Sequence, residues 1–152
     1  MRRLPEGGRE GGSDPTPSAD TPDGMPLAVA AESLYLANLL LLPGIAFLAL
    51  ISLALRVSPQ VPPLAAAHLA QTVAASLWGG ALLVIVNVLI LLLGGYRGAY
   101  TWVLVILYFT VCHSTLVVLG VVGLAKAMAG QCWRYPLIGR ALPPGCPGAG
   151  RS

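Results

Sequence analysis

Three long apolar runs follow one another along the chain, at about 34–55, 73–93 and 101–125. As helices they would measure about 31 to 38 Å, against a bilayer hydrocarbon core of about 30 Å. Short linkers rich in Pro or Gly, at 56–63 and 94–100, separate the runs and favour an antiparallel return each time. The pattern predicts an all-α membrane protein: residues 33–135 would form three transmembrane helices in an antiparallel bundle, with the two termini on opposite sides.

The segments that flank this domain are polar. Residues 1–32 are rich in Gly, Pro and charged side chains. They have too few large apolar groups to offset the entropy lost on ordering, so we predict a disordered leader. The leader's arginines lie well upstream of the first apolar run, unlike the charges of a cleaved signal peptide. Residues 136–152 are predicted to be a short C-terminal tail.

Small and polar residues form stripes within the apolar runs. At 100° per residue, Ser76, Gly80 and Asn87 share one face of the second run, and Gly120 and Gly123 share one face of the third. Such stripes favour helix packing in lipid, where close backbone approach and hydrogen bonds replace the hydrophobic effect. Asn38 would lie level with Asn87 in antiparallel helices. We therefore expect their amides to form a hydrogen bond.

Two positions inside the runs admit a structural and a functional interpretation. Pro43, followed by Gly44, predicts a kink in the first run, either as a static bend or as a hinge. His113 is the ionisable residue closest to the middle of a run, where such a group is a functional candidate. It could relay a proton or bind a ligand, or it could only form a hydrogen bond to a neighbouring helix. Cys112 beside it has the character of a small apolar filler.

Composition agrees with a membrane location and restricts the chemistry. The chain is 56% hydrophobic and 10% charged, with a mean hydropathy of +0.76. These values are typical of the membrane class. All six carboxylates occur at or before Glu32, and the rest of the chain has none. We find no paired carboxylates, catalytic triad, phosphate-binding loop or metal-ligand spacing, so we expect no enzyme activity, cofactor or metal site.

Positive charge predicts the orientation. Four basic residues lie on the C-terminal side of the predicted bundle, namely Arg56, Lys126, Arg134 and Arg140. Only Arg97 lies on the other side, so the positive-inside rule predicts a cytoplasmic C-terminus in a bacterial inner membrane. The positive charges suit anionic lipid headgroups better than nucleic acid. Cys132 and Cys146 would remain thiols in the cytoplasm and could pair in an oxidising compartment.

Two short segments resemble a known family. His68 and Gln71 form a His-x-x-Gln element, and residues 125–137 read AKAMAGQCWRYPL, with Gly130, Arg134, Tyr135 and Pro136. This chain resembles, over about residues 30–140, the bacterial domain-of-unknown-function family that is related to the chloroplast inner-envelope protein-import channel, the Tic-twenty-like proteins. The resemblance implies a small polytopic helical protein whose plastid relatives move preproteins through a membrane.

The same motif residues have a plain structural interpretation. Gly130 would end the third helix in a left-handed cap, Pro136 would prevent the helix from resuming, and Arg134 would anchor the helix end at the headgroups. We therefore expect a noncatalytic accessory or assembly subunit, whose partners are the lipid bilayer and other membrane subunits or further copies of itself. The alternative is an oligomeric pore or protein-translocation component, as the resemblance implies.

Overall fold

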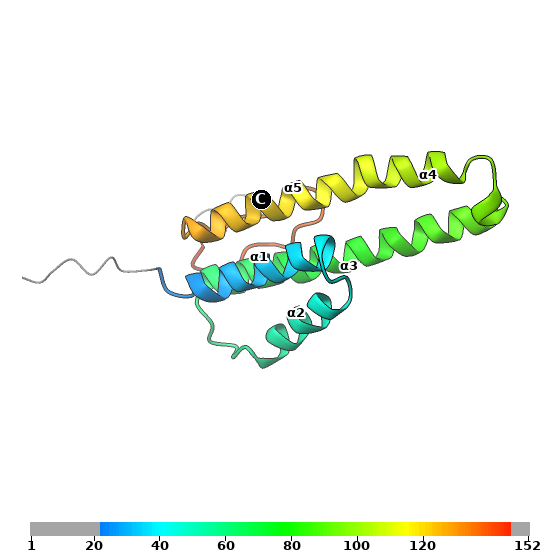
Figure 1. The fold of residues 1–152 in the computed structure, drawn as a ribbon. Helices are drawn as coiled ribbons and strands as arrows, with labels where there is room; N and C mark the ends of the chain where they lie inside the picture. The colour runs from blue at the N-terminus through cyan, green and yellow to red at the C-terminus, as the bar shows by residue number, and fades with distance from the viewer. Residues whose placement is uncertain (1–21, 147–152) are drawn as a thin grey trace, which may run out of the picture.

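The computed structural model describes residues 22–146, which contain helices and no strand (Figure 1). Two long helical rods lie side by side and antiparallel, and two short helices pack against one half of them. In chain order the elements are α1 (Met25–Leu40), α2 (Ile45–Arg56), α3 (Pro63–Leu92), the 3-10 turn η1 (Gly95–Arg97), α4 (Thr101–Leu107), the π-helical segment η2 (Tyr108–His113) and α5 (Ser114–Met128).

The long hairpin consists of α3 and the continuous run α4–η2–α5. Its helices contain 30 and 28 residues, with peak mean hydropathies of 2.3 and 2.2. At about 1.5 Å per residue both exceed the hydrocarbon thickness of a bilayer. Among the described residues, these two helices are long and apolar enough to cross a membrane. Two of the three predicted spans are thus present as membrane-length helices, and the second begins ten residues earlier than the pattern at 73–93 suggests.

The first predicted span is not one helix. The apolar run at 34–55 is divided between α1, with 16 residues, and α2, with 12. Pro43 has no N–H to continue a helix, and Gly44 adopts a φ of 85°. The side chain of Asn38 accepts a hydrogen bond from the Gly44 N–H at 3.0 Å, which stabilises the reversal. The expected kink is therefore a full break, and α1 and α2 form a short helical hairpin.

Helix α1 also begins earlier than the sequence pattern predicts. It starts at Met25, so residues 25–32 of the predicted leader are helical, while residues 1–21 lie outside the described part of the chain. Pro26 lies in the first turn of α1, where its missing N–H costs no helical hydrogen bond. The polar residue Glu32 is therefore carried into the packed part of the molecule.

The described chain ends meet at one end of the long hairpin, which we call the base. A Cβ on Gly24 would lie 2.9 Å from Pro62, and one on Gly130 would lie 2.7 Å from Pro22. The starts of α1 and α3 and the end of α5 therefore gather at the base, and η1 forms the opposite end, the tip (Figure 1). The expectation of chain ends on opposite sides is wrong for residues 22–146, because α2 returns the chain to the base before α3 begins.

The C-terminal segment packs back onto the helices instead of forming a free tail. Gly130, at a φ of 65°, ends α5 in the expected left-handed cap. The Gln131 N–H donates to the Lys126 carbonyl at 2.9 Å, which completes a Schellman motif. Beyond the cap, Tyr135 is 1% exposed and Cys146 is 6% exposed. Residues 131–146 are thus part of the folded base, and they include 136–146 of the predicted tail, whose residues 147–152 lie outside the described part of the chain.

Candidate functional site

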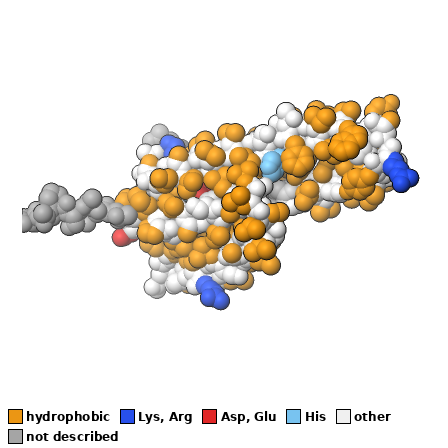
Figure 2. Space-filling view, viewed as in Figure 1, with side chains coloured by type: hydrophobic (Ala, Val, Ile, Leu, Met, Phe, Trp, Pro, Cys, Tyr) orange, Lys and Arg blue, Asp and Glu red, His pale blue; other side chains and the backbone are white. Residues whose placement is uncertain are grey.

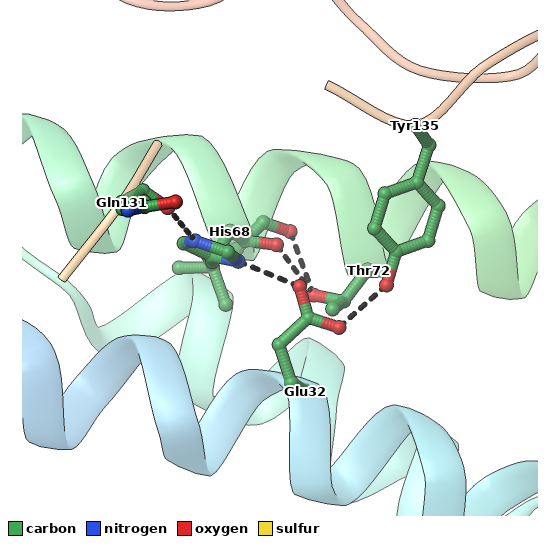
Figure 3. A network of polar contacts seen from close by, with 6 residues as sticks. Glu32, His68, Thr72, Gln131 and Tyr135 are labelled. Atoms are coloured by element: carbon green, nitrogen blue, oxygen red, sulfur yellow. Dashed lines mark hydrogen bonds and ion pairs between the residues drawn. The ribbon is translucent and has the colours of Figure 1, made fainter. Parts of the chain in front are cut away.

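A cluster of buried polar groups at the base joins three parts of the chain (Figure 3). We call Glu32, His68, Tyr135 and the Gln131 carbonyl the polar cluster. Glu32 comes from α1 and His68 from α3, and both side chains are fully buried. Glu32 Oε1 lies 2.7 Å from His68 Nδ1, and Glu32 Oε2 lies 2.5 Å from the Tyr135 hydroxyl. One carboxyl group therefore binds both α3 and the C-terminal segment to α1.

The hydrogen-bond partners of His68 determine where its protons lie. Nε2 is 3.0 Å from the Gln131 backbone oxygen, which can only accept, so Nε2 carries a hydrogen. The bond between Nδ1 and Glu32 then holds one proton, either as neutral carboxylic acid and imidazole or as carboxylate and imidazolium. Both forms have zero net charge. The pair is therefore buried without a net charge, which lowers the cost of removing it from water.

Burial raises the pKa values of the Glu32 carboxyl group and the Tyr135 hydroxyl. Both groups lie outside the two membrane-length helices. Desolvation raises the pKa of Glu32 above its ordinary value, opposed by hydrogen bonds from His68 and Tyr135 and by the charge of His68. Desolvation, with the neighbouring Glu32 carboxylate, also raises the pKa of the Tyr135 hydroxyl. Tyr135 therefore acts as a neutral hydrogen-bond donor to the carboxyl group.

Glycines on α5 make the close approach of α1 feasible. A Cβ on Gly123 would lie 2.6 Å from Glu32 Oε2, and one on Gly120 would lie 2.7 Å from the ring of Tyr35. The Tyr35 hydroxyl donates to the Leu116 carbonyl of α5 at 3.0 Å. The stripe of small residues predicted on the third run thus faces α1, and the glycines admit a carboxyl group and an aromatic ring.

Gln71 holds the C-terminal segment through a second pair of hydrogen bonds. Its Nε2 donates to the Arg140 carbonyl at 2.8 Å, and its Oε1 accepts from the Arg140 N–H at 3.0 Å. Gln71 is fully buried and lies one helical turn after His68 on α3. The His-x-x-Gln element therefore presents two side chains on one helical face, and each binds backbone of the C-terminal segment.

A disulfide closes the C-terminal segment on itself. Cys132 and Cys146 are joined, with Cα atoms 5.8 Å apart. Around this link the rings of Trp133 and Tyr135 pack with centroids 5.0 Å apart, and Tyr135 also meets Tyr35 edge to face. Covalent and aromatic contacts thus support the segment that supplies the Tyr135 hydroxyl.

The remaining motif residues lie at the surface of the base. The Arg134 guanidinium donates from Nε to the Gly139 carbonyl at 3.3 Å, and the Pro136 carbonyl accepts from the Ile138 N–H at 2.9 Å. Both residues shape the turn that follows Tyr135. This turn also brings Gly139 close to Gln71. A Cβ on Gly139 would lie 2.6 Å from the Gln71 Oε1.

The predicted bond between Asn38 and Asn87 is absent, and that expectation is wrong. Asn38 binds Gly44 N–H, whereas Asn87 donates to the Leu83 carbonyl at 2.8 Å and accepts from the Tyr96 hydroxyl. The reason is the break after α1. The helix ends at Leu40, and the Asn38 side chain binds the turn that follows instead of Asn87. Each side-chain amide forms its hydrogen bonds with nearby residues instead.

His113 and Pro43 come together away from the polar cluster. Both line a cavity of about 630 Å³ between α1, α3 and η2, together with Asn38. Cys112 is a half-buried free thiol beside it. The sequence thus identified several residues of one cavity without indicating that they meet.

Glu32 is the residue of the polar cluster that the sequence analysis missed as a site. It was assigned to the leader because it precedes the apolar run, yet one signal was available. Glu32 lies three residues before Tyr35 in the first helix. In the second, His68 lies three residues before Gln71 and four before Thr72. Residues three or four apart share a helical face, so each helix has a polar stripe near its start. Two such stripes on helices that begin at the same end predict a shared polar contact.

The polar cluster joins α1, α3 and the C-terminal segment and is closed to solvent. Glu32 and His68 have no accessible surface, and neither lines the cavity described above or a smaller one of about 380 Å³ beside Trp78. Comparisons of the chain with protein-family models, with curated proteins and with solved structures find no match. The resemblance to the Tic-twenty-like family therefore stays a prediction.

Proposed function

We propose that this chain is a noncatalytic multi-pass integral membrane protein that packs against other membrane subunits in a bacterial inner membrane. The observation that supports this proposal is the uncovered apolar half of the long hairpin, from the middle of α3 through η1 to η2. Figure 2 shows hydrophobic side chains over this half, with a basic group at its far end. Its surface is mainly apolar contact area, with Cys112 and His113 partly exposed on η2.

The exposure of individual side chains supports a role in lateral contact. Leu91 is 63% exposed, Val103 is 53% exposed and Ile106 is 60% exposed, although all lie on membrane-length helices. Exposed apolar area of this extent requires lipid or a protein partner around it. The base, in contrast, is closed by its own hydrogen bonds. We propose that the base gives the hairpin a fixed shape and that the tip half supplies the contact surface.

Two membrane crossings fit this geometry better than three. The α1–α2 hairpin, whose helices of about 24 and 18 Å are shorter than the hydrocarbon core, would enter the bilayer from the base and return to it. Three basic residues lie in the last turn of α5 or after it, near the base, namely Lys126, Arg134 and Arg140. Arg97 lies at the tip. By the positive-inside rule we propose a cytoplasmic base.

The cysteine pair tests this orientation. A disulfide is typical of oxidising compartments. A cytoplasmic base therefore predicts that Cys132 and Cys146 are reduced thiols in growing cells. They would form the disulfide only after the protein is isolated in air. Alkylation of intact cells with a membrane-permeant maleimide, before lysis, should then modify both residues. If the maleimide modified Cys132 and Cys146 only after a reductant was added, the base would lie on the oxidising side of the membrane and the proposed orientation would be wrong.

Site-specific photo-crosslinking tests the packing function. We would place a photoreactive amino acid at Leu91 or Ile106 in the tip half, and at Leu48 or Leu55 on α2 as matched exposed controls. Tip positions should crosslink to a protein of defined mass in native membranes, and the α2 positions should not. Crosslinks to lipid alone at all four positions would contradict the proposal.

The alternative function, an oligomeric pore or translocation component, rests on the family resemblance. Two membrane-length helices enclose no channel, so a pore requires several copies of the chain. Crosslinks from the tip positions to a second copy, together with ion conductance after reconstitution of the purified protein, would favour the pore. A hetero-complex without conductance would favour the accessory subunit.

A further inference from the structure

The cavity of about 630 Å³ has three walls of different origin. The end of α1, the link to α2 and the first turn of α2 supply Asn38, Pro43 and Phe47, respectively. The middle of α3 supplies a wall that includes Ser76 and Gly80, and the segment η2 supplies the remaining wall. A cavity of this size is within the range of small-molecule sites in proteins. It lies in the half of the molecule whose surroundings are apolar, so it is accessible to molecules dissolved in the bilayer.

One wall holds a polar group without a partner. Ser76 is 5% exposed, and its hydroxyl has no hydrogen-bond partner among the described residues. Its neighbour one turn earlier, Thr72, is satisfied by the His68 carbonyl at 2.9 Å. A buried hydroxyl without a partner costs free energy, so an acceptor that reaches Ser76 from the cavity would relieve that cost.

The polar side chains around the cavity offer hydrogen-bond donors from all three walls. The Asn38 carbonyl oxygen already accepts from the Gly44 N–H, which leaves the amide nitrogen as a donor. His113 offers a ring N–H and Ser76 its hydroxyl. No Asp, Glu, Lys or Arg lines the cavity in the described part of the chain. The site therefore selects an uncharged molecule with acceptors on more than one side.

The wall formed by η2 adds aromatic rings to the cavity. In a π-helix, residues five apart share a face, so Tyr108 and His113 both reach the cavity. The Phe109 ring lies 5.2 Å from the His113 ring and 5.3 Å from the Tyr108 ring, centroid to centroid. The ring planes of Tyr108 and Phe109 stand at 85° and those of Phe109 and His113 at 57°, so the widened turn places aromatic edges and faces next to the donors.

We propose that this cavity binds the head group of an isoprenoid quinone. A quinone ring is planar and uncharged, and its two carbonyl oxygens accept hydrogen bonds on opposite sides. Its isoprenoid tail is apolar and can leave the cavity along the exposed faces of α3 and η2. A phospholipid headgroup would bring charges for which no lining residue is a partner, and a simple ester lipid has its acceptors at one end only.

A photoreactive quinone tests the proposal on the full chain in lipid nanodiscs. An azido-benzoquinone with a decyl tail should label residues 76–84 and 108–113, as mapped by mass spectrometry. Excess decylubiquinone should prevent the labelling, and methyl decanoate, which has a similar chain and no ring, should not. Equal competition by methyl decanoate, or labelling spread over the lipid-facing surface, would overturn the proposal.

Matched variants separate binding from folding. Gly80→Phe should abolish protection by decylubiquinone, because a Cβ at Gly80 meets no atom within 4 Å and the ring would occupy the cavity. Val118→Phe places the same side chain on an exposed face of α5 and should bind normally. Ser76→Ala should weaken binding about five-fold, the value of one neutral hydrogen bond. Ser33→Ala is its exposed control.

The free protein provides the second measurement. Ser76→Ala removes an unpartnered hydroxyl, so without quinone it should unfold at the same or a higher temperature than the parent chain. A variant that is as stable as the parent and binds decylubiquinone equally well would contradict the proposed role of Ser76. Retained affinity in a folded Gly80→Phe variant would place the ligand elsewhere and overturn the proposal. Neither result depends on whether the tip half has a protein partner.

Discussion

The base and the tip of the hairpin are stabilised in different ways. At the base, four segments meet around fully buried polar side chains, and a disulfide closes the last of them. At the tip, the helices expose their apolar side chains, and the polar groups of Asn87 and Tyr96 bind each other or nearby backbone. The base therefore derives its stability from specific contacts within the chain. The tip half depends on what surrounds it.

This difference predicts the largest loss of stability at Glu32. Glu32→Ala should lower the free energy of unfolding by about 3–5 kcal/mol, because His68 and Tyr135 would lose their shared partner in a buried site. Glu32→Gln should cost only about 1 kcal/mol, since an amide can still donate to His68 and accept from Tyr135. Denaturant titration in mixed micelles measures both values. Equal losses for the two variants would show that the hydrogen bonds do not stabilise the base.

Reduction of the disulfide should have the next largest effect. Breaking the link between Cys132 and Cys146, whose sequence separation is 14, should destabilise the base by about 2–4 kcal/mol. Hydrogen exchange measured with and without reductant should show faster exchange for residues 131–146 and an unchanged tip. Faster exchange at the tip as well would mean that base and tip unfold together. The double variant Cys132→Ser, Cys146→Ser controls for the reductant.

A smaller effect is expected at Gln71. Gln71→Leu keeps the volume and removes both bonds to the Arg140 backbone, at a cost of about 1–3 kcal/mol. The peptide that contains Arg140 should then exchange faster in hydrogen-exchange mass spectrometry, while the α1–α5 contact at Gly120 stays protected. Loss of protection throughout α5 would instead assign Gln71 to the core of the whole base.

The smallest effect is expected at the tip. Asn87→Leu should change stability in micelles by less than about 1 kcal/mol, because Asn87 is bonded to its own helix and to exposed Tyr96. The same substitution in native membranes also tests for a partner at the tip. A loss of several kcal/mol in micelles would contradict the contrast between the two ends.

Hydropathy predicted part of this fold, because it reports how apolar each stretch is. The positions of α3 and α5, the Gly130 cap and the glycine stripe on α5 follow from local patterns. The break at Pro43 does not, since a proline in an apolar run is compatible with a kink as well as with a reversal. The break changes the number of membrane-length helices and moves both described chain ends to the base.

The candidate site was less predictable than the fold because its partners are distant in the sequence. His68 and Glu32 are separated by 36 residues, and Tyr135 and Glu32 by 103. The sequence identified His68, Gln71 and Tyr135 as motif residues but paired none of them with Glu32. The contact depends on α1 beginning at Met25 and on the C-terminal segment folding back, and neither follows from apolar periodicity.

The distance between Glu32 and Tyr135 along the chain has a consequence for biosynthesis. The ribosome makes Glu32 103 residues before Tyr135, so a nascent chain carries a Glu32 without its partners while α3 and α5 are still being made. An unpaired carboxylate strongly disfavours entry into hydrocarbon. Glu32 should therefore keep α1 at the membrane surface until His68 arrives, and the arrival of Tyr135 should complete the polar cluster.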